Sequence, residues 1–179
     1  MGPDITLRKK GYCFNYRVAG ILLHQGRILL QGDRKRGYFV PPGGRCSFGE
    51  SASSAARREI REELGIRANL GRLLWVVENL FPLDSYKFHE IGFYFEVKFD
   101  KSDLNKLPEG SFPGPEMRPN QFFRWIPLRK IGQFHVYPPF LAKKIRRLPR
   151  STEYLFIDQL PKINILNSVI PLLRSRNKR

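Results

Sequence analysis

The sequence predicts a single α/β domain, and three features lead to that expectation. The chain has 179 residues, a length typical of one domain with its own core. Residues 91–99 alternate apolar and other side chains with the period of two that is typical of a half-buried strand. Residues 51–65 instead combine a capping serine, helix-forming alanines and a closing glycine, which indicates a central helix. Strand-like segments on both sides of a helix predict a sheet covered by helices.

The segments before the helix predict a hairpin followed by a glycine-rich turn. Apolar residues dominate 15–23 and return at 27–31, and the His-Gln-Gly between them is a hairpin signal. A charged loop, 32–37, follows, in which Arg34 either faces incoming phosphates or is simply exposed. Residues 41–44, Pro-Pro-Gly-Gly, then place two glycines where the backbone must turn tightly.

The helix carries three glutamates on one face. Glu59, Glu62 and Glu63 fall within an arc of roughly 100°, and Ile60 and Leu64 lie beside that arc, where they can contact a core. Like charges on one face repel unless a cation neutralises them, and oxygen ligands suit Mg²⁺ or Mn²⁺. The alternative is an ordinary solvated acidic face that the arginines of the same helix neutralise.

Two strands are expected after the helix. The apolar run 70–81 fits a buried strand, and a turn near Asp84 would pair it with 91–99. This hairpin sets Glu78 opposite roughly Glu90 and brings two more carboxylates together. A shift of one residue would turn one of them to the other face. They are therefore either surface glutamates at strand ends, or a fourth metal ligand or a base.

The rest of the chain predicts a long loop and several short elements. Residues 101–120 contain repeated prolines and glycines, and we expect a loop that covers the substrate. A strand at 122–126, a helix at 140–148 and a small strand at 153–157 are expected next. The apolar segment 164–173 is expected to dock, for instance on a partner subunit in a homodimer.

The residues around the helix match a complete Nudix box, so the chain resembles a Nudix hydrolase. The box, G-x(5)-E-x(7)-R-E-U-x-E-E-x-G-U with U apolar, fits at every specified position from Gly44 to Ile66. Residues 122–140 also resemble the later part of ADP-ribose-pyrophosphatase-like members. Many members of the family carry Trp-x-Leu-Pro-Gly-Gly before the box, and this sequence departs from that pattern at Phe39 and Pro41.

The resemblance implies an α/β/α sandwich with a mixed sheet, in which the box forms a loop, a helix and a loop. The Nudix hydrolase domain would span residues 13–150, between a basic lead-in at 1–12 and a basic C-terminal extension at 151–179 that packs on the same domain. The implied reaction is divalent-metal-dependent hydrolysis of a phosphoanhydride bond in a nucleoside diphosphate linked to another group. ADP-ribose-like compounds are the first expectation, and nucleoside triphosphates, including oxidised ones, are the second.

The resemblance also assigns roles to the residues of the box. Glu59, Glu62 and Glu63 would bind Mg²⁺ or Mn²⁺ together with the carbonyl of Gly43, and Glu59 would thereby be catalytic. Arg58 would orient a carboxylate, either Glu50 or Glu62, rather than touch the substrate. The structural positions of the box would be Gly44, Glu50 and Gly65.

The base and the substrate contacts are expected outside or at the edge of the box. The attacking water would lose its proton to the least engaged box glutamate, to Glu78 or to Glu90, and Glu90 is our choice. A substrate base could stack on Phe39 or Tyr94, although an aromatic residue is more often part of a core. Arg34 is the expected phosphate contact.

The charge and cysteine content bear on partners and compartment. The net charge of +16 calls for a polyanionic partner, and the last 39 residues supply half of the excess. That region would be a solubilising tail, steer nucleotide phosphates or contact RNA weakly. Cys13 and Cys46 lack metal-ligand spacing, so we expect free thiols in a reducing, cytoplasmic compartment. No apolar run is long enough for a membrane span.

A second class of function remains open at this point. A protein with the same fold could use its basic tail to bind a nucleotide or RNA without cleaving it. The intact box argues against that alternative, because a protein that only binds has no physical need for all four box glutamates. Steeply salt-dependent RNA binding without metal-dependent hydrolysis would favour it.

Overall fold

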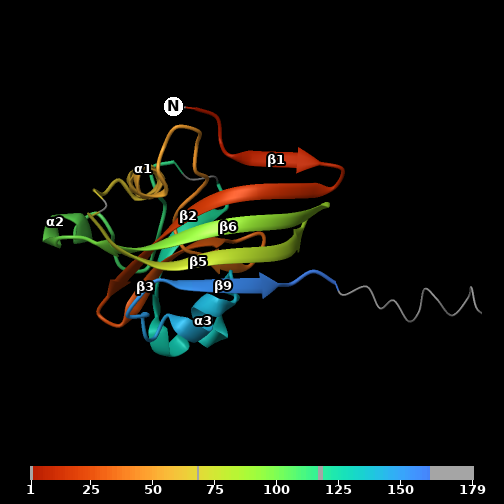
Figure 1. The fold of residues 1–179 in the computed structure, drawn as a ribbon. Helices are drawn as coiled ribbons and strands as arrows, with labels where there is room; N and C mark the ends of the chain where they lie inside the picture. The colour runs from red at the N-terminus through yellow and green to blue at the C-terminus, as the bar shows by residue number, and fades with distance from the viewer. Residues whose placement is uncertain (1, 68, 117–118, 162–179) are drawn as a thin grey trace, which may run out of the picture.

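The computed structural model describes residues 2–67, 69–116 and 119–161 and confirms an α/β fold with a mixed sheet (Figure 1). The strands are β1 (Thr6–Lys9), β2 (Tyr12–His24), β3 (Arg27–Asp33), β4 (Tyr38–Val40), β5 (Asn69–Leu83), β6 (Tyr86–Lys98), β7 (Ser111–Phe112), β8 (Gln121–Pro127) and β9 (Glu153–Asp158). The helices are α1 (Ala52–Leu64), α2 (Lys101–Leu104), the 3₁₀ helix η1 (Leu128–Gln133) and α3 (Phe140–Lys144).

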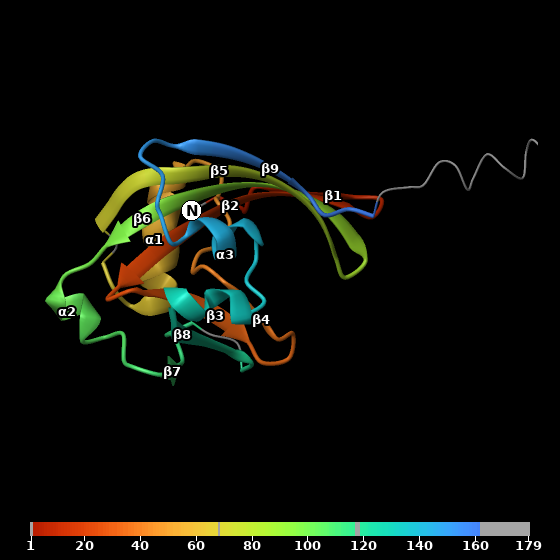
Figure 2. The ribbon, with the colours of Figure 1, turned by 90° about the horizontal axis from the view of Figure 1, so that it is seen from below.

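The sheet runs in the order β7-β8-β3-β2-β6-β5-β9, with β1 added to β2 and β4 added to β3. β2 and β3 form the predicted hairpin, whose turn residues Gln25 and Gly26 both have positive φ. β2 also runs parallel to β6 along most of its length, and β9 runs parallel to β5. Figure 2 shows β5, β6 and β9 arching over β3 and β8, so the two parts of the sheet face each other across a core.

The central helix forms where the sequence predicts it and ends as predicted. The side chain of Ser51 accepts the backbone N–H of Ser54, and Gly65 closes the helix in the left-handed conformation. Ile60 packs against Gly20 of β2, where a Cβ atom would lie only 2.7 Å from the Ile60 side chain. A larger residue at Gly20 would push α1 away from the sheet.

The two helical layers lie on opposite faces of the sheet and confirm the sandwich. Gly20 faces α1, whereas the preceding residue, Ala19, and its partner across the sheet, Tyr94, belong to the core under α3. Phe140 of α3 packs edge-on against Trp75 and Tyr94. Successive strand residues point to opposite faces, so each layer packs on alternate residues of β2.

The hairpin after the helix is present, but its register corrects one expectation. Asp84 has a φ of 52° at the turn, and β5 pairs with β6 so that Asn79, not Glu78, lies opposite Glu90. Glu78 pairs with Ile91. Because the side-chain period is two, this shift of one residue puts Glu78 and Glu90 on opposite faces. The prediction that the two carboxylates lie together is therefore wrong.

This alternation gives the sheet an inner and an outer face. The inner face of β2, β6 and β5 carries Asn15, Arg17, Glu90 and Asn79, on the same side as Ala19 and Tyr94 of the core. The outer face includes Tyr12, Phe14, His89 and Glu78.

Several shorter expectations are met only in part. The expected loop at 101–120 contains α2 and β7, and the expected helix at 140–148 is the shorter α3. Residues of the basic lead-in form β1 and pair with β2, and the first residues of the C-terminal extension form β9 and pair with β5. The segment 164–173 and most of the basic tail lie outside the described residues.

Two further findings concern the cysteines and membranes. Cys13 and Cys46 are buried free thiols, as expected. None of the helices in the described part of the chain has the length and apolar content that a bilayer crossing requires.

Candidate active site

Arg58 of α1 connects the acidic residues of the box. Its guanidinium donates hydrogen bonds to Glu50 at 2.8 Å, to Glu59 at 2.8 Å and to Glu62 at 2.9 Å. It also donates to the backbone carbonyl of Arg45 at 2.9 Å, and its side chain is only 11% exposed. The hydrogen bond from Arg58 lowers the pKa of the Glu50 carboxyl. The structure thus brings Arg58 to both carboxylates that the sequence suggested, Glu50 and Glu62.

Glu63 is tied to the glycine turn instead of to Arg58. Its carboxylate accepts the backbone N–H of Gly43 at 2.8 Å and the side-chain amide of Gln31 at 3.2 Å. Burial raises the pKa of Glu63 to about 7, against its ordinary value near 4.5. The carbonyl of Gly43 accepts a hydrogen bond from Arg17 at 3.0 Å. Glu63, Gly43 and Arg17 therefore form one hydrogen-bonded group.

Gly43 and Gly44 each lack room for a side chain, but for different reasons. Gly43 has a φ of 140°, and a Cβ atom there would lie 2.2 Å from the backbone carbonyl oxygen of Val18. At Gly44 a Cβ atom would lie 2.3 Å from the carboxylate of Glu59. Gly43 lets the turn approach β2, and Gly44 leaves the space that the Glu59 side chain fills.

Glu90 of β6 is linked to the box loop through Asn15. Glu90 is 7% exposed and accepts a hydrogen bond from the Asn15 side chain at 2.6 Å. Asn15 in turn accepts from Arg45 of the box loop at 2.8 Å. Burial alone would lower the pKa of Arg17, but the nearby negative charge of Glu90 and of the box carboxylates raises it. The inner face of the sheet and the box therefore form one polar, charged site.

Glu78, the other candidate base, lies elsewhere. It is on the outer face, where His89 contacts its carboxylate at 2.8 Å and the hydroxyl of Tyr154 donates to it. These two partners lower the pKa of Glu78, the contact with Tyr154 first. The structure thus separates Glu78 from the site and keeps Glu90 in it.

Four residues of the site were not singled out from the sequence: Asn15, Arg17, Gln31 and Arg45. The available signal was in β2, where Asn15 and Arg17 interrupt an otherwise apolar strand at alternate positions. Polar residues two apart on a buried strand face need partners, since an unpaired buried charge is costly. This pattern in β2 indicates a polar inner face whose side chains need partners from another part of the chain, here the glycine turn and the box loop.

The donor set suits a hard divalent cation, although it is not preassembled. Glu50, Glu59 and Glu62 share the single guanidinium of Arg58, which leaves surplus negative charge, and burial raises the pKa of Glu59 and Glu63. Oxygen donors with uncompensated charge are what Mg²⁺ and Mn²⁺ bind. Among the described residues, no three acidic, histidine or cysteine side chains gather closely enough to hold an ion as they lie. Binding would therefore need side-chain rearrangement.

The expected substrate contacts are placed less favourably. Phe39 is 9% exposed and packs edge-on against Phe122 and Phe134, and Tyr94 is buried. Both rings are thus core residues. The guanidinium of Arg34 lies 5.0 Å from the centre of the Phe122 ring.

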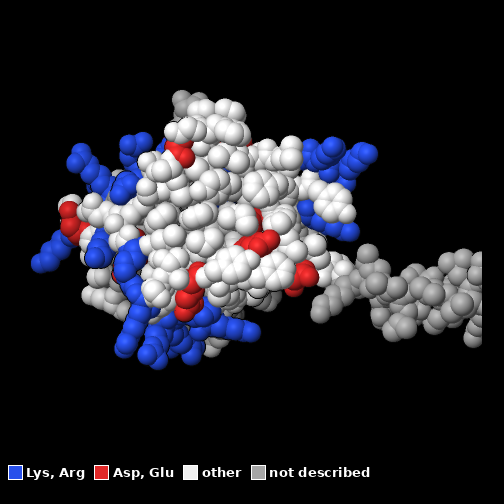
Figure 3. Space-filling model, viewed as in Figure 1, with Lys and Arg blue, Asp and Glu red and all other residues white. Residues whose placement is uncertain are grey.

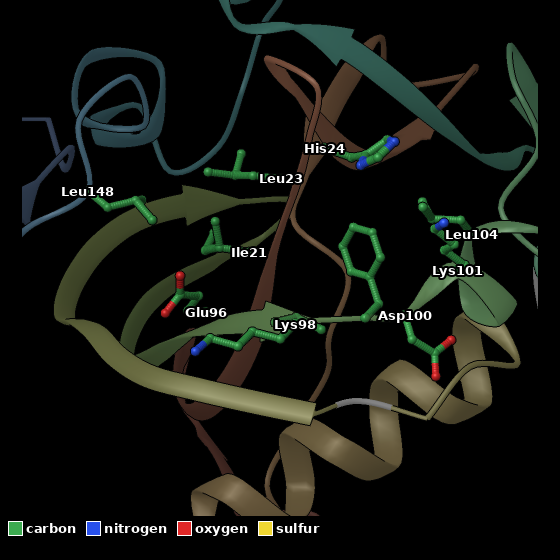
Figure 4. A pocket seen from close by; sticks show the side chains of 11 residues that line it. Ile21, Leu23, His24, Glu96, Lys98, Asp100, Lys101, Leu104 and Leu148 are labelled. Carbon is green, nitrogen blue, oxygen red and sulfur yellow. The ribbon is translucent and has the colours of Figure 1, made fainter.

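A cavity of about 600 Å³ lies on the inner side of the sheet beside α2 (Figure 4). Its lining includes His24, Glu96 and Lys101, and no residue of the box takes part. The box carboxylates and this cavity are therefore separate features.

Comparisons with known proteins agree with the fold. A family model described as the NUDIX domain matches residues 14–148. A mMutator MutT protein from Bacillus halodurans is similar in structure, with a TM-score of 0.61, 19% identity, and coverage of 80% of this chain and 89% of that chain. A NUDIX hydrolase from Nitrosomonas europaea has a TM-score of 0.54, 17% identity, and coverage of 81% and 79%. An ADP-ribose pyrophosphatase from Streptococcus suis has a TM-score of 0.50, 14% identity, and coverage of 79% and 98%. At these identities the solved structures show the fold.

Proposed function

The chain belongs to the NUDIX domain family, and on that premise we propose that it hydrolyses a phosphoanhydride bond in a nucleoside diphosphate linked to another group, with Mg²⁺ or Mn²⁺. One observation carries this proposal. The acidic residues of α1, the glycine turn and the inner face of the sheet meet through the contacts of Arg58, Gly43 and Arg17. A site that only binds nucleotide would not need such a concentration of buried carboxylates.

The proposed roles follow from what each group can do. A divalent cation held by Glu59, Glu62 and Glu63 would offset the negative charge of the phosphate oxygens and orient a water. Arg58 would keep Glu59 and Glu62 close to each other, since it donates to both. Gly43, which already holds Glu63 through its N–H, would contribute its carbonyl oxygen.

Glu90 is the proposed acceptor of the proton from the attacking water. Its carboxylate is fixed by Asn15, which Arg45 fixes in turn, so its position relative to the box loop is defined. A base bound to protein groups rather than to the cation keeps more of its basicity. Glu78 is not proposed for this role, because it faces the other side of the sheet.

The substrate proposal is an ADP-ribose-like compound first and a nucleoside triphosphate, including an oxidised one, second. The similar structures include one titled an ADP-ribose pyrophosphatase and one titled a MutT protein, which supports keeping both classes. The softer resemblance at 122–140 ranks the first above the second. The basic charge of the chain suits either anionic substrate.

The test is a substrate panel with each metal, in which chromatography of the products identifies the broken bond. Wild-type protein should hydrolyse at least one ADP-ribose-like or triphosphate substrate only when Mg²⁺ or Mn²⁺ is present. Glu63→Gln should lower kcat by about 100-fold or more, because one buried oxygen ligand loses its charge. Turnover near the wild-type value in Glu63→Gln would remove Glu63 from the site, and RNA binding without any hydrolysis would favour the binding-module alternative.

A further inference from the structure

Strand pairing aligns two rows of side chains on the outer face of β1, β2 and β6. Lys9 pairs with Tyr12, which pairs with Lys87 on the next strand. Phe14 lies opposite His89 in the adjacent row. Directly paired residues point to the same face, so two lysines flank one tyrosine, and a second aromatic ring lies beside them.

These residues line one part of a shallow cavity of about 310 Å³, near the lower end of the range for ligand pockets, and the rest of its lining is apolar: Leu7, Cys13, Leu80, Phe88 and Leu160. Its lining includes Lys9, Tyr12, Phe14, Lys87 and His89. Tyr12 is 60% exposed, and the ammonium of Lys87 lies 5.8 Å from the centre of its ring. We call these five residues the Tyr12 site.

The backbone holds the lysines in place around the tyrosine. The turn between β1 and β2 has Lys10 and Gly11 at positive φ, which makes it a tight turn between Lys9 and Tyr12. The N–H of Lys87 donates to the carbonyl of Gly11 at 2.8 Å, so β6 is joined to this turn. Figure 3 shows basic side chains gathered at this end of the outer face, on either side of an uncharged patch.

We propose that the Tyr12 site binds single-stranded nucleic acid. The ammonium groups of Lys9, Lys10 and Lys87 would contact successive backbone phosphates, and an unpaired base would stack on Tyr12. Exposed aromatic rings between basic side chains are the combination that single strands require, because every base has a face that can stack. The net charge of +16 attracts the same polyanion.

The acidic residues of the outer face limit the site. The carboxylate of Glu78 lies beside the Tyr12 site because it contacts His89. It is already hydrogen-bonded to both His89 and Tyr154. Beyond it, Tyr154 and Phe156 of β9 are exposed aromatics, but Asp158 lies on the same strand face. The bound nucleic acid would therefore follow β1, β2 and β6 and avoid β9.

The site is independent of the candidate active site. Tyr12 and Lys87 point to the outer face, whereas Asn15 and Glu90 on the same two strands point to the inner face. The box helix packs farther along the same face of β2, at Val18 and Gly20, and no residue of the box lines the cavity of the Tyr12 site. Substitutions in the Tyr12 site should therefore leave hydrolysis unchanged.

The test measures fluorescence anisotropy of a labelled oligouridylate of about twelve nucleotides with the full chain, in EDTA to prevent hydrolysis. Tyr12→Leu should weaken binding by about tenfold, and Tyr12→Phe should restore it, because phenylalanine keeps the stacking surface. Lys9→Gln combined with Lys87→Gln should reduce the slope of log affinity against log salt by about 1.4 between about 50 and 200 mM, the loss expected for two phosphate contacts. Hydrolysis by both variants should stay within about twofold of wild type.

The matched control replaces two exposed lysines elsewhere, Lys106 and Lys130, with glutamine and should bind as wild type does. A second comparison replaces the last four basic residues of the chain, Arg174, Arg176, Lys178 and Arg179. The proposal is overturned if only the tail variant loses binding, if Tyr12→Leu binds as tightly as wild type, or if a duplex binds as tightly as the single strand. It is also overturned if vesicles with anionic lipid bind through Tyr12 and the oligonucleotide does not.

Discussion

The two faces of β2 and β6 differ in how their polar residues are stabilised. On the inner face Asn15, Arg17 and Glu90 are largely removed from water, and each has a polar partner. On the outer face Tyr12 and Lys87 are exposed and keep their contact with solvent. Burying charges is costly unless they are paired, so the inner face has one permitted arrangement, whereas the outer face remains free to take a partner. The pleat of a strand thus separates a fixed, charged site from an adaptable surface.

The largest effect should separate the two glutamates that the sequence alone placed together. Glu90→Gln should lower kcat by about 10²- to 10⁴-fold, the usual contribution of a general base, with little change in KM. Glu78→Gln, on the outer face, should stay within about twofold of wild type. Steady-state kinetics on the best substrate of the panel measures both. Equal losses in the two variants would contradict the division of the sheet into a catalytic and a non-catalytic face.

Substituting the two glycines of the turn should affect different properties, stability at Gly43 and activity at Gly44. Gly43→Ala should lower the free energy of unfolding by about 3 kcal/mol, because its Cβ atom would collide with the backbone of Val18 and its φ disfavours alanine. Gly44→Ala should keep the fold, because the flexible Glu59 side chain can move, but should lower kcat by about 100-fold. Urea unfolding and kinetics on both variants separate these effects. A fully active Gly44→Ala would show that the position of the Glu59 carboxylate does not matter.

Removing the guanidinium that the box carboxylates share should also destabilise the protein. Arg58→Met should lower the free energy of unfolding by about 3 kcal/mol, since Glu50, Glu59 and Glu62 would then repel one another without the guanidinium that they share. Arg57→Met is the matched control, because the Arg57 side chain is exposed on the same helix. It should change the free energy of unfolding by less than about 0.5 kcal/mol. Urea unfolding at low salt measures the difference. Similar values for the two variants would mean that solvent already screens the box charges.

The box could be predicted from the sequence because it is local, whereas the register of the sheet could not. Ser51, Arg58 and Gly65 act within one helix, so their spacing in the chain fixes their spacing in space. Glu90 and Asn15 are 75 positions apart, and their contact depends on a pairing in which a shift of one residue changes the face. The same shift moved Glu78 out of the site.

The substrate contacts were harder to predict for a different reason. The sequence shows that Phe39 is aromatic and near the box, but not that Phe122 and Phe134 pack against it. A ring on a loop and a ring in a core have the same local signal, and only the long-range packing separates them. Arg17 was missed because a single arginine in an apolar strand does not reveal its partners. Those partners, Gly43 and Glu90, come from distant parts of the chain, and only the fold brings them to Arg17.

The smallest expected effect concerns how the buried inner site responds to pH and metal. Because burial raises the pKa of Glu63 to about 7, the folded protein in EDTA binds more protons than the unfolded chain between about pH 4.5 and 7. Its stability should therefore fall by about 1–3 kcal/mol as pH rises through that window and then level off.

Mg²⁺ binds the ionised carboxylates, so the rise in Tm that it causes should be several degrees larger at about pH 8 than at about pH 5.5. Thermal unfolding at both pH values, with and without Mg²⁺, measures this difference. Glu63→Gln should remove most of the pH dependence, whereas Glu78→Gln should keep it, because Glu78 lies on the outer face and its pKa is lowered rather than raised. If Mg²⁺ raised Tm equally at the two pH values, the ionised form of Glu63 would not be what the cation stabilises.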